Sequence, residues 1–164
     1  AKVINGYKSV VIYDPFDAKA IKQTYPEYGV ELSCKAITYT AFLADLVKSG
    51  ALKAEKKHSA VVLQDAFQLS RDLEETEEAR AVVSEFAELH EMHLNRAETV
   101  WAGNILMAQY IPDVMKLVAE RRIFNAKSLG ENTIVTTCVS EYVSLKNAES
   151  SDVQILSLED LILG

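Results

Sequence analysis

The sequence predicts an α/β fold in which a mainly parallel sheet is flanked by helices. Short apolar and β-branched runs alternate with segments of helical periodicity along most of the chain, which is the pattern of βαβ units. A strand-helix-strand-helix order occurs at the front of the chain and again at its end, which indicates one and a half βαβ-type pseudo-repeats. The 164 residues, 49% of them apolar and 25% charged, are enough to bury one core.

The front of the chain predicts two strands, each followed by a helix. Residues 9–13 form an apolar, β-branched run of the kind found in buried strands. The pair Asp14-Pro15 suits the N-cap and first position of a helix, which we expect to end at about Thr24, because a proline restricts the residue before it. A second strand is expected at residues 36–39 and a second helix at residues 40–48.

The rest of the chain continues the alternation. Ala79, Val82, Val83, Phe86 and Leu89 recur at helical spacing, which predicts a long helix over residues 76–94. The other expected elements are strands at 60–64, 133–137 and 153–156, a possible strand at 99–102, a helix at 112–128, a short helix capped by Ser140, and a terminal turn with the capping box Ser157-x-x-Asp160.

These elements predict a single domain that covers residues 1–164. Its front, residues 1–52, corresponds to a partial first repeat, and residues 53–164 form the second repeat. The front copy lacks a counterpart for residues 60–130.

Composition and charge exclude several classes of function. Seventeen Lys and Arg residues against twenty-four Asp and Glu residues give a net charge of −7, which disfavours binding to nucleic acid. We expect no direct membrane insertion, because no segment is long and apolar enough, and we expect no signal peptide at the start of the chain. Two cysteines cannot make a disulfide framework, nor hold a four-cysteine iron–sulfur cluster without another chain. We expect a cytoplasmic protein with reduced cysteines.

Five segments, in register along nearly the whole chain, carry a resemblance to a known family. They are residues 10–29 (VVIYDPFDAKAIKQTYPEYG), 37–52 (ITYTAFLADLVKSGAL), 61–71 (VVLQDAFQLSR), 91–103 (EMHLNRAETVWAG) and 112–146. Together they resemble the cysteine-rich, CCG-type iron–sulfur domains of heterodisulfide reductase subunits and of the iron–sulfur subunits that oxidise glycolate, lactate and glycerol 3-phosphate.

The resemblance implies an iron–sulfur oxidoreductase whose cluster is held by cysteines and whose partners are redox protein subunits, either a flavoprotein or another iron–sulfur protein. This chain departs from the family at the cysteines themselves. Of the seven ligand-type positions in the matched segments, only Cys138 is still cysteine. The other six positions are occupied by Asp14, Asp17, Phe67, Trp101, Ala102 and Glu141.

We interpret the chain as a degenerate copy of this domain that has lost its cluster. One thiolate cannot hold such a cluster, and an empty cluster site would destabilise the core. We therefore expect the rings of Phe67 and Trp101 to fill the vacated site and pack near Cys138. The chain would then be a structural or partner-docking part of a redox system, with no cofactor and no catalytic residue of its own.

Two alternatives keep a cofactor. In one, the chain is an active electron-transfer protein whose cluster is completed by another chain or by non-cysteine ligands. In the other, it is a small metal-dependent enzyme in which Asp14, Asp17, Cys138 and Glu141 hold a divalent metal. The carboxylates favour Mg²⁺ or Mn²⁺, and the thiolate favours Zn²⁺ or iron.

The remaining chemistry-bearing residues give weaker signals. His90 and His93 stand three residues apart within the expected 76–94 helix, so they could form half of a metal site. The simpler interpretation is that both face solvent at the end of that helix. No nucleophile elbow, P-loop or dinucleotide-binding glycine pattern is present.

Overall fold

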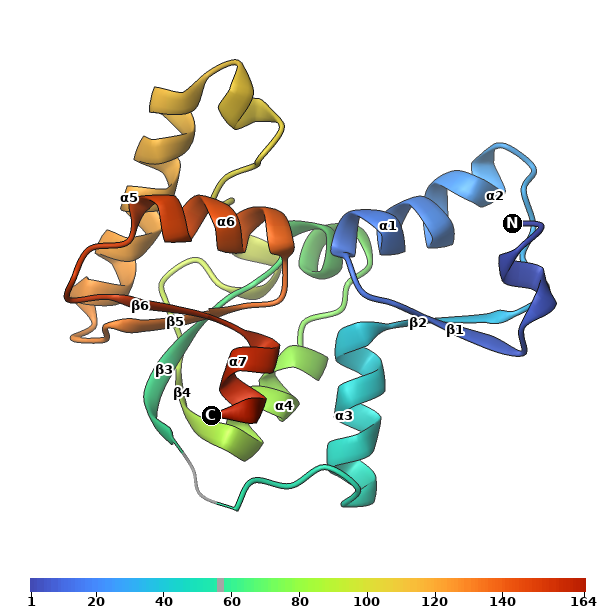
Figure 1. Cartoon of the computed structure of the whole chain (residues 1–164), viewed down its shortest axis with the longest axis horizontal. Coiled ribbons are helices and arrows are strands. Elements are labelled where there is room, and N and C mark those ends of the chain that lie inside the picture. The colour runs from blue at the N-terminus through green and yellow to red at the C-terminus, as the bar shows by residue number, and fades with distance from the viewer. Residues whose placement is uncertain (56–57) are drawn as a thin grey trace.

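The structure, a computed structural model, describes residues 1–55 and 58–164 and confirms the predicted α/β class (Figure 1). All strand pairs are parallel, and they form two sheets rather than one. The smaller sheet pairs β1 (Ser9–Ile12) with β2 (Lys35–Thr38). The larger sheet has the order β4-β3-β5-β6, and its strands are β3 (His58–Gln64), β4 (Ala87–His90), β5 (Thr133–Thr136) and β6 (Gln154–Ser157).

Helices connect and cover these strands. The principal helices are α1 (Pro15–Lys19), α2 (Tyr25–Glu27), α3 (Tyr39–Ser49), α4 (Glu78–Phe86), α5 (Pro112–Ser128), α6 (Val139–Ala148) and α7 (Leu158–Leu163). Two π-helical turns, η2 (Ala20–Thr24) and η3 (Gln68–Asp72), and three short 3₁₀ turns, η1 (Ile4–Gly6), η4 (Arg96–Glu98) and η5 (Met107–Gln109), complete the described elements. None of the helices within residues 1–55 and 58–164 has the length and apolar character needed to cross a bilayer.

The predicted repeat is visible as two β-α-β-α units. The front unit runs through β1, α1, β2 and α3, and the rear unit through β5, α6, β6 and α7. In each unit the two strands are parallel neighbours. Figure 1 shows the two strand pairs pointing their carboxyl ends toward each other at the centre of the molecule.

The predicted long helix over residues 76–94 is wrong in its second half. Helix α4 ends at Phe86, and Ala87 turns into extended backbone (φ −147°, ψ 170°). Residues 87–90 then form β4, which pairs with β3. Apolar residues at 86, 87 and 89 fit either a helix or a strand, and the free edge of β3 decides between them because it supplies backbone partners.

Two further expectations are corrected by side-chain hydrogen bonds. Residues 99–102 form no strand, because the carbonyls of Thr99 and Val100 accept from side chains instead of from a neighbouring strand. Ser140 does not cap α6. The N-cap is Cys138, which makes no side-chain cap bond, and the Ser140 hydroxyl accepts from the backbone N–H of Ile105 at 3.0 Å.

The front helix also extends beyond its predicted end at Thr24. The chain stays helical to Glu27, with Pro26 inside α2. The π-helical turn η2 precedes it, and the N–H of Tyr25 bonds to the carbonyl of Ala20. The wider turn accommodates a proline that would clash in a regular helix.

Three apolar clusters make the core. One lies between the large sheet and α3, α4 and α7, and one lies under α5 and α6. The third joins the two units, because Ile12 and Ala18 of the front unit pack with Cys138 of the rear unit. Ala66 and Leu69, which follow β3, complete this cluster.

Candidate functional site

Cys138, the cysteine at a position where the resemblance implies a ligand, is an interior residue. It follows β5, is 1% exposed and belongs to the apolar cluster that joins the two units. Burial raises the pKa of its thiol to about 12, and the negative charges of Glu141 and Asp14 act in the same direction. Burial therefore disfavours the thiolate form of this cysteine.

Asp14 and Asp17, the two aspartates at the start of the front helix, have different structural roles. Asp14 caps α1 and accepts a hydrogen bond from the Phe16 N–H at 2.8 Å, as the sequence predicts. Asp17 lies in the first turn of α1 and is exposed. Across residues 1–55 and 58–164, no group of three or more His, Cys, Asp and Glu side chains is arranged to hold a metal ion.

Glu141 lies wholly inside the protein. Its Oε2 atom accepts from Gln64 Nε2 at 3.2 Å, while Oε1 has no hydrogen-bond partner. Burial raises the pKa of this carboxyl group to about 8, against the lowering effects of Gln64, the Ala102 backbone N–H and Arg122. Glu141 is thus part of an internal polar network.

Arg122 is the centre of that network, and the sequence reasoning did not identify it. Its side chain is 0% exposed, its Nε donates to Gln64 Oε1 at 2.6 Å, and its Nη1 donates to the His93 carbonyl at 3.2 Å. Burial lowers the pKa of the guanidinium, and the nearby Glu141 opposes that effect. Gln64 therefore bridges the arginine and the carboxyl group.

A signal for Arg122 was present in the sequence. It follows Met115 and Ala119 and precedes Ala126 at helical spacing, so it lies within the apolar stripe that α5 turns to the core. A charged residue in such a stripe indicates a buried interaction.

A buried ion pair lies beside this network. Arg80 Nη1 and Nη2 donate to the two carboxylate oxygens of Asp65 at 2.6 and 2.8 Å, and Arg80 Nε donates to Glu91 at 2.7 Å. Burial acts to lower the pKa of Arg80, but these carboxylates outweigh it and raise the pKa. The backbone N–H of Arg96 also donates to Asp65, so both carboxylate oxygens of this aspartate accept hydrogen bonds within the fold.

The expectation that Phe67 and Trp101 pack around Cys138 is not what the structure shows. The aromatic ring packed against the Cys138 cluster is that of Phe16, and the cluster contains neither Phe67 nor Trp101. Phe67 instead lies under the guanidinium of Arg71, 4.8 Å from ring centre to Cζ. Phe16 comes from α1, so the front unit supplies the ring beside this cysteine.

The segment around Ala102 packs directly on α6. Ala102 is 0% exposed. Gly103 has a φ of +124°, and a Cβ there would stand 2.5 Å from the Cβ of Ser144. The small residues at these positions therefore allow close contact between the loop and the helix.

The two histidines do not share a helix face. His90 lies on β4, where its Nδ1 is 2.7 Å from Glu131 Oε1 and its Nε2 is 3.2 Å from Glu88 Oε1. These two carboxylates raise the pKa of His90. His93 follows the strand in an exposed loop, so the helical half-site has no structural basis.

A cleft of about 250 Å³ opens where the carboxyl ends of the two strand pairs meet. Tyr13 follows β1 and Tyr39 follows β2, while Cys138 follows β5 and Leu158 follows β6. In parallel α/β sheets, ligands bind at the carboxyl ends of strands. This cleft is the candidate binding site of the fold.

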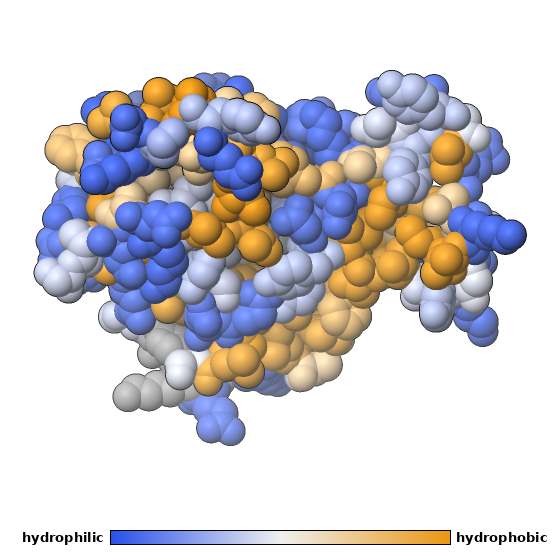
Figure 2. Space-filling view, turned by 45° about the horizontal axis from the view of Figure 1, so that its top comes forward, coloured by the Kyte–Doolittle hydropathy of each residue, from blue (hydrophilic) through white to orange (hydrophobic). Residues whose placement is uncertain are grey.

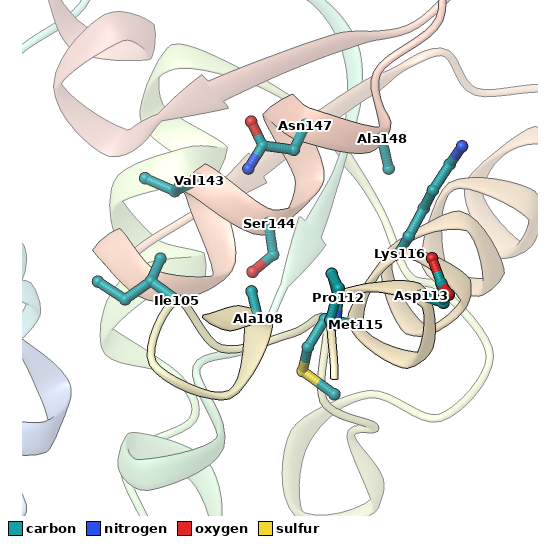
Figure 3. Close-up of a pocket in the computed structure, with 10 residues that line it drawn as sticks. All are labelled: Ile105, Ala108, Pro112, Asp113, Met115, Lys116, Val143, Ser144, Asn147 and Ala148. Carbon is teal, nitrogen blue, oxygen red and sulfur yellow. The ribbon is translucent and has the colours of Figure 1, made fainter. Parts of the chain in front are cut away.

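A second hollow, of about 380 Å³, lies between the start of α5 and α6. Figure 3 shows Val143, Ser144 and Asn147 of α6 facing Ile105 and Ala108 across it.

Apolar residues beside this second hollow are exposed. Tyr110 is 83% exposed, Leu106 65% and Leu117 64%. In Figure 2, apolar surface lies over the corner where the chain enters α5 and along the arm that carries β1 and β2.

The comparisons with known proteins add little. No family model and no curated protein matches the sequence. Among solved structures, the chain is similar to the glutamate racemase isoform RacE1 from Bacillus anthracis, with 14% identity and a TM-score of 0.46. That match covers 98% of this chain and 57% of the racemase chain. The racemase's activity is not transferred to this chain on such a likeness.

Proposed function

We propose that this chain is a cysteine-rich-type domain without a cluster, which serves as a structural and partner-docking part of a redox system related to heterodisulfide reductase. The observation that carries the proposal is the use of the former ligand positions. Asp14 caps a helix, Ala102 packs on α6 and Glu141 joins a buried network. Each of these residues supports the fold from a position where the resemblance implies a ligand.

The residues present do not fit an iron–sulfur cluster. Cluster ligands are thiolates, and several are needed. Cys138 is the only cysteine at a ligand-type position, and its thiol is buried with a raised pKa. No redox step is therefore assigned to this chain.

The exposed apolar residues near the start of α5 support the docking role. Large apolar patches on a soluble surface mark contacts with other proteins. Leu106, Tyr110 and Leu117 stand out from the surface and contribute little to the core. The partner proposed is a redox protein subunit, either a flavoprotein or an iron–sulfur protein.

Metal analysis after anaerobic purification tests the proposal. We expect a colourless, folded protein with no absorbance at about 400 nm and no stoichiometric iron or acid-labile sulfide. Stoichiometric iron and sulfide that disappear in the Cys138→Ser variant would refute it and favour a cluster completed by another chain. Zinc or manganese without sulfide, lost on Asp14→Asn or Glu141→Gln, would instead favour a metal-dependent enzyme.

A further inference from the structure

The cleft between the two strand pairs has an unbalanced charge. Its lining residues include Glu159 and Asp160 but no lysine or arginine. Asp160 is already used, since it accepts from the Ser157 N–H at 2.9 Å in the capping box of α7. Glu159 has no part in that capping box.

Glu159 is placed to receive a hydrogen-bond donor. Its carboxylate lies against the hydroxyl groups of Tyr13 and Tyr39 and contributes, after burial, to raising the pKa of both phenols to about 12. Its Oε1 atom is buried and has no hydrogen-bond partner. A buried carboxylate oxygen without a donor costs free energy, and a cationic donor in the cleft would remove that cost.

Aromatic rings form the walls beside this carboxylate. The rings of Tyr13 and Tyr39 are 5.1 Å apart, centre to centre, and inclined by 50°. Tyr142 also lines the cleft, and its ring already has an ammonium group, that of Lys146, 5.8 Å from its centre. Tyrosine faces attract cations, most strongly where water is partly excluded.

We propose that the cleft binds the ammonium group of a small organic cation, with Glu159 as the charge partner and Tyr13 and Tyr39 as the aromatic walls. The volume of about 250 Å³ lies below that of sites for drug-sized molecules, which indicates a ligand of few heavy atoms. The proposal is independent of the cluster question, because the cleft is formed by residues outside the former ligand set except for Cys138.

Titration with butylammonium chloride, followed by the NMR signals of the tyrosine rings, tests this site. We expect saturable shifts of the Tyr13 and Tyr39 signals with butylammonium and none with the neutral isostere 1-butanol. Glu159→Gln should weaken butylammonium binding by about tenfold or more, because it removes a charge-assisted hydrogen bond. Glu120→Gln, an exposed change on α5, is the matched control and should bind as the wild type does.

Three outcomes would overturn the proposal: no saturable shift in the wild-type protein, equal binding of 1-butanol, or unchanged binding by Glu159→Gln. Tyr13→Leu gives a second reading in case Glu159→Gln disturbs α7. Tyr13 is 52% exposed, so its replacement leaves the core intact while removing one aromatic wall. A Tyr13→Leu variant that binds butylammonium as tightly as the wild type would equally reject the site.

Discussion

Glu141 offers the sharpest test of the buried network. Burial raises the pKa of its carboxyl group to about 8, from an ordinary value of 4.5. In the unfolded chain the group titrates near its ordinary value, so the folded state holds the proton more tightly. The stability that this group contributes is therefore fully present below about pH 4.5 and is lost as the pH rises to about 8.

The size of the effect follows from the two pKa values. At about 1.4 kcal/mol for each pH unit between them, the loss in the free energy of unfolding is on the order of 5 kcal/mol. Glu141→Gln keeps the side-chain shape and an oxygen that accepts from Gln64, but it does not titrate. We expect the variant to become more stable than the wild type, by an amount of that order, between about pH 4.5 and about pH 8.

Urea unfolding at a series of pH values, followed by far-ultraviolet circular dichroism, measures this difference. His90, whose pKa is also raised, titrates in both proteins and cancels from the comparison. Glu120→Gln, exposed on α5, controls for the loss of one carboxylate. A stability difference that stays constant across the pH range would refute the reasoning, because it would mean that Glu141 is ionised in the folded protein and paired with Arg122.

Three further outcomes are expected. Arg80→Met should lower the free energy of unfolding by about 3–5 kcal/mol in a urea titration, because it leaves the buried carboxylate of Asp65 without its charge partner. The surface control Lys116→Met should lower it by less than about 1 kcal/mol. Cys138 should resist alkylation by iodoacetamide in the native protein and react only when the protein unfolds, because its thiol is buried. Mass spectrometry measures this labelling, and rapid labelling of the native protein would contradict the burial of the thiol. Gly103→Ala should lower the thermal unfolding midpoint, because the new methyl group would meet the Cβ of Ser144. Adding Ser144→Gly removes that Cβ and should partly restore the midpoint. An unchanged midpoint in Gly103→Ala, or no recovery in the double variant, would contradict the close packing.

Local chemistry explains the successes of prediction from sequence. The helix start at Asp14-Pro15, the boundaries of Pro112–Ser128 and the capping box at Ser157 and Asp160 all match the structure. Each depends on residues within one or two turns of each other, so the sequence carries the whole signal. The repeated strand-helix order could be predicted because it too depends on local sequence patterns.

Long-range pairing explains the failures. Residues 87–90 fit a helix by spacing and become a strand because β3 offers a free edge. The ring packed on the Cys138 cluster is that of Phe16 from the front helix, and the cluster contains neither Phe67 nor Trp101. Both outcomes depend on contacts with distant parts of the chain, so the local sequence of these segments does not predict them.

The sequence by itself determined the α/β class and the strand-helix-strand-helix order at the two ends of the chain. Only the tertiary structure decided what Asp14, Ala102 and Glu141 contact. Gln64, Arg122 and Glu141 come from a strand and two helices far apart in the chain, and their hydrogen bonds exist only once these elements pack. The cleft likewise exists only because two separate strand pairs turn their carboxyl ends toward each other, an arrangement set by packing across the core rather than by any local pattern.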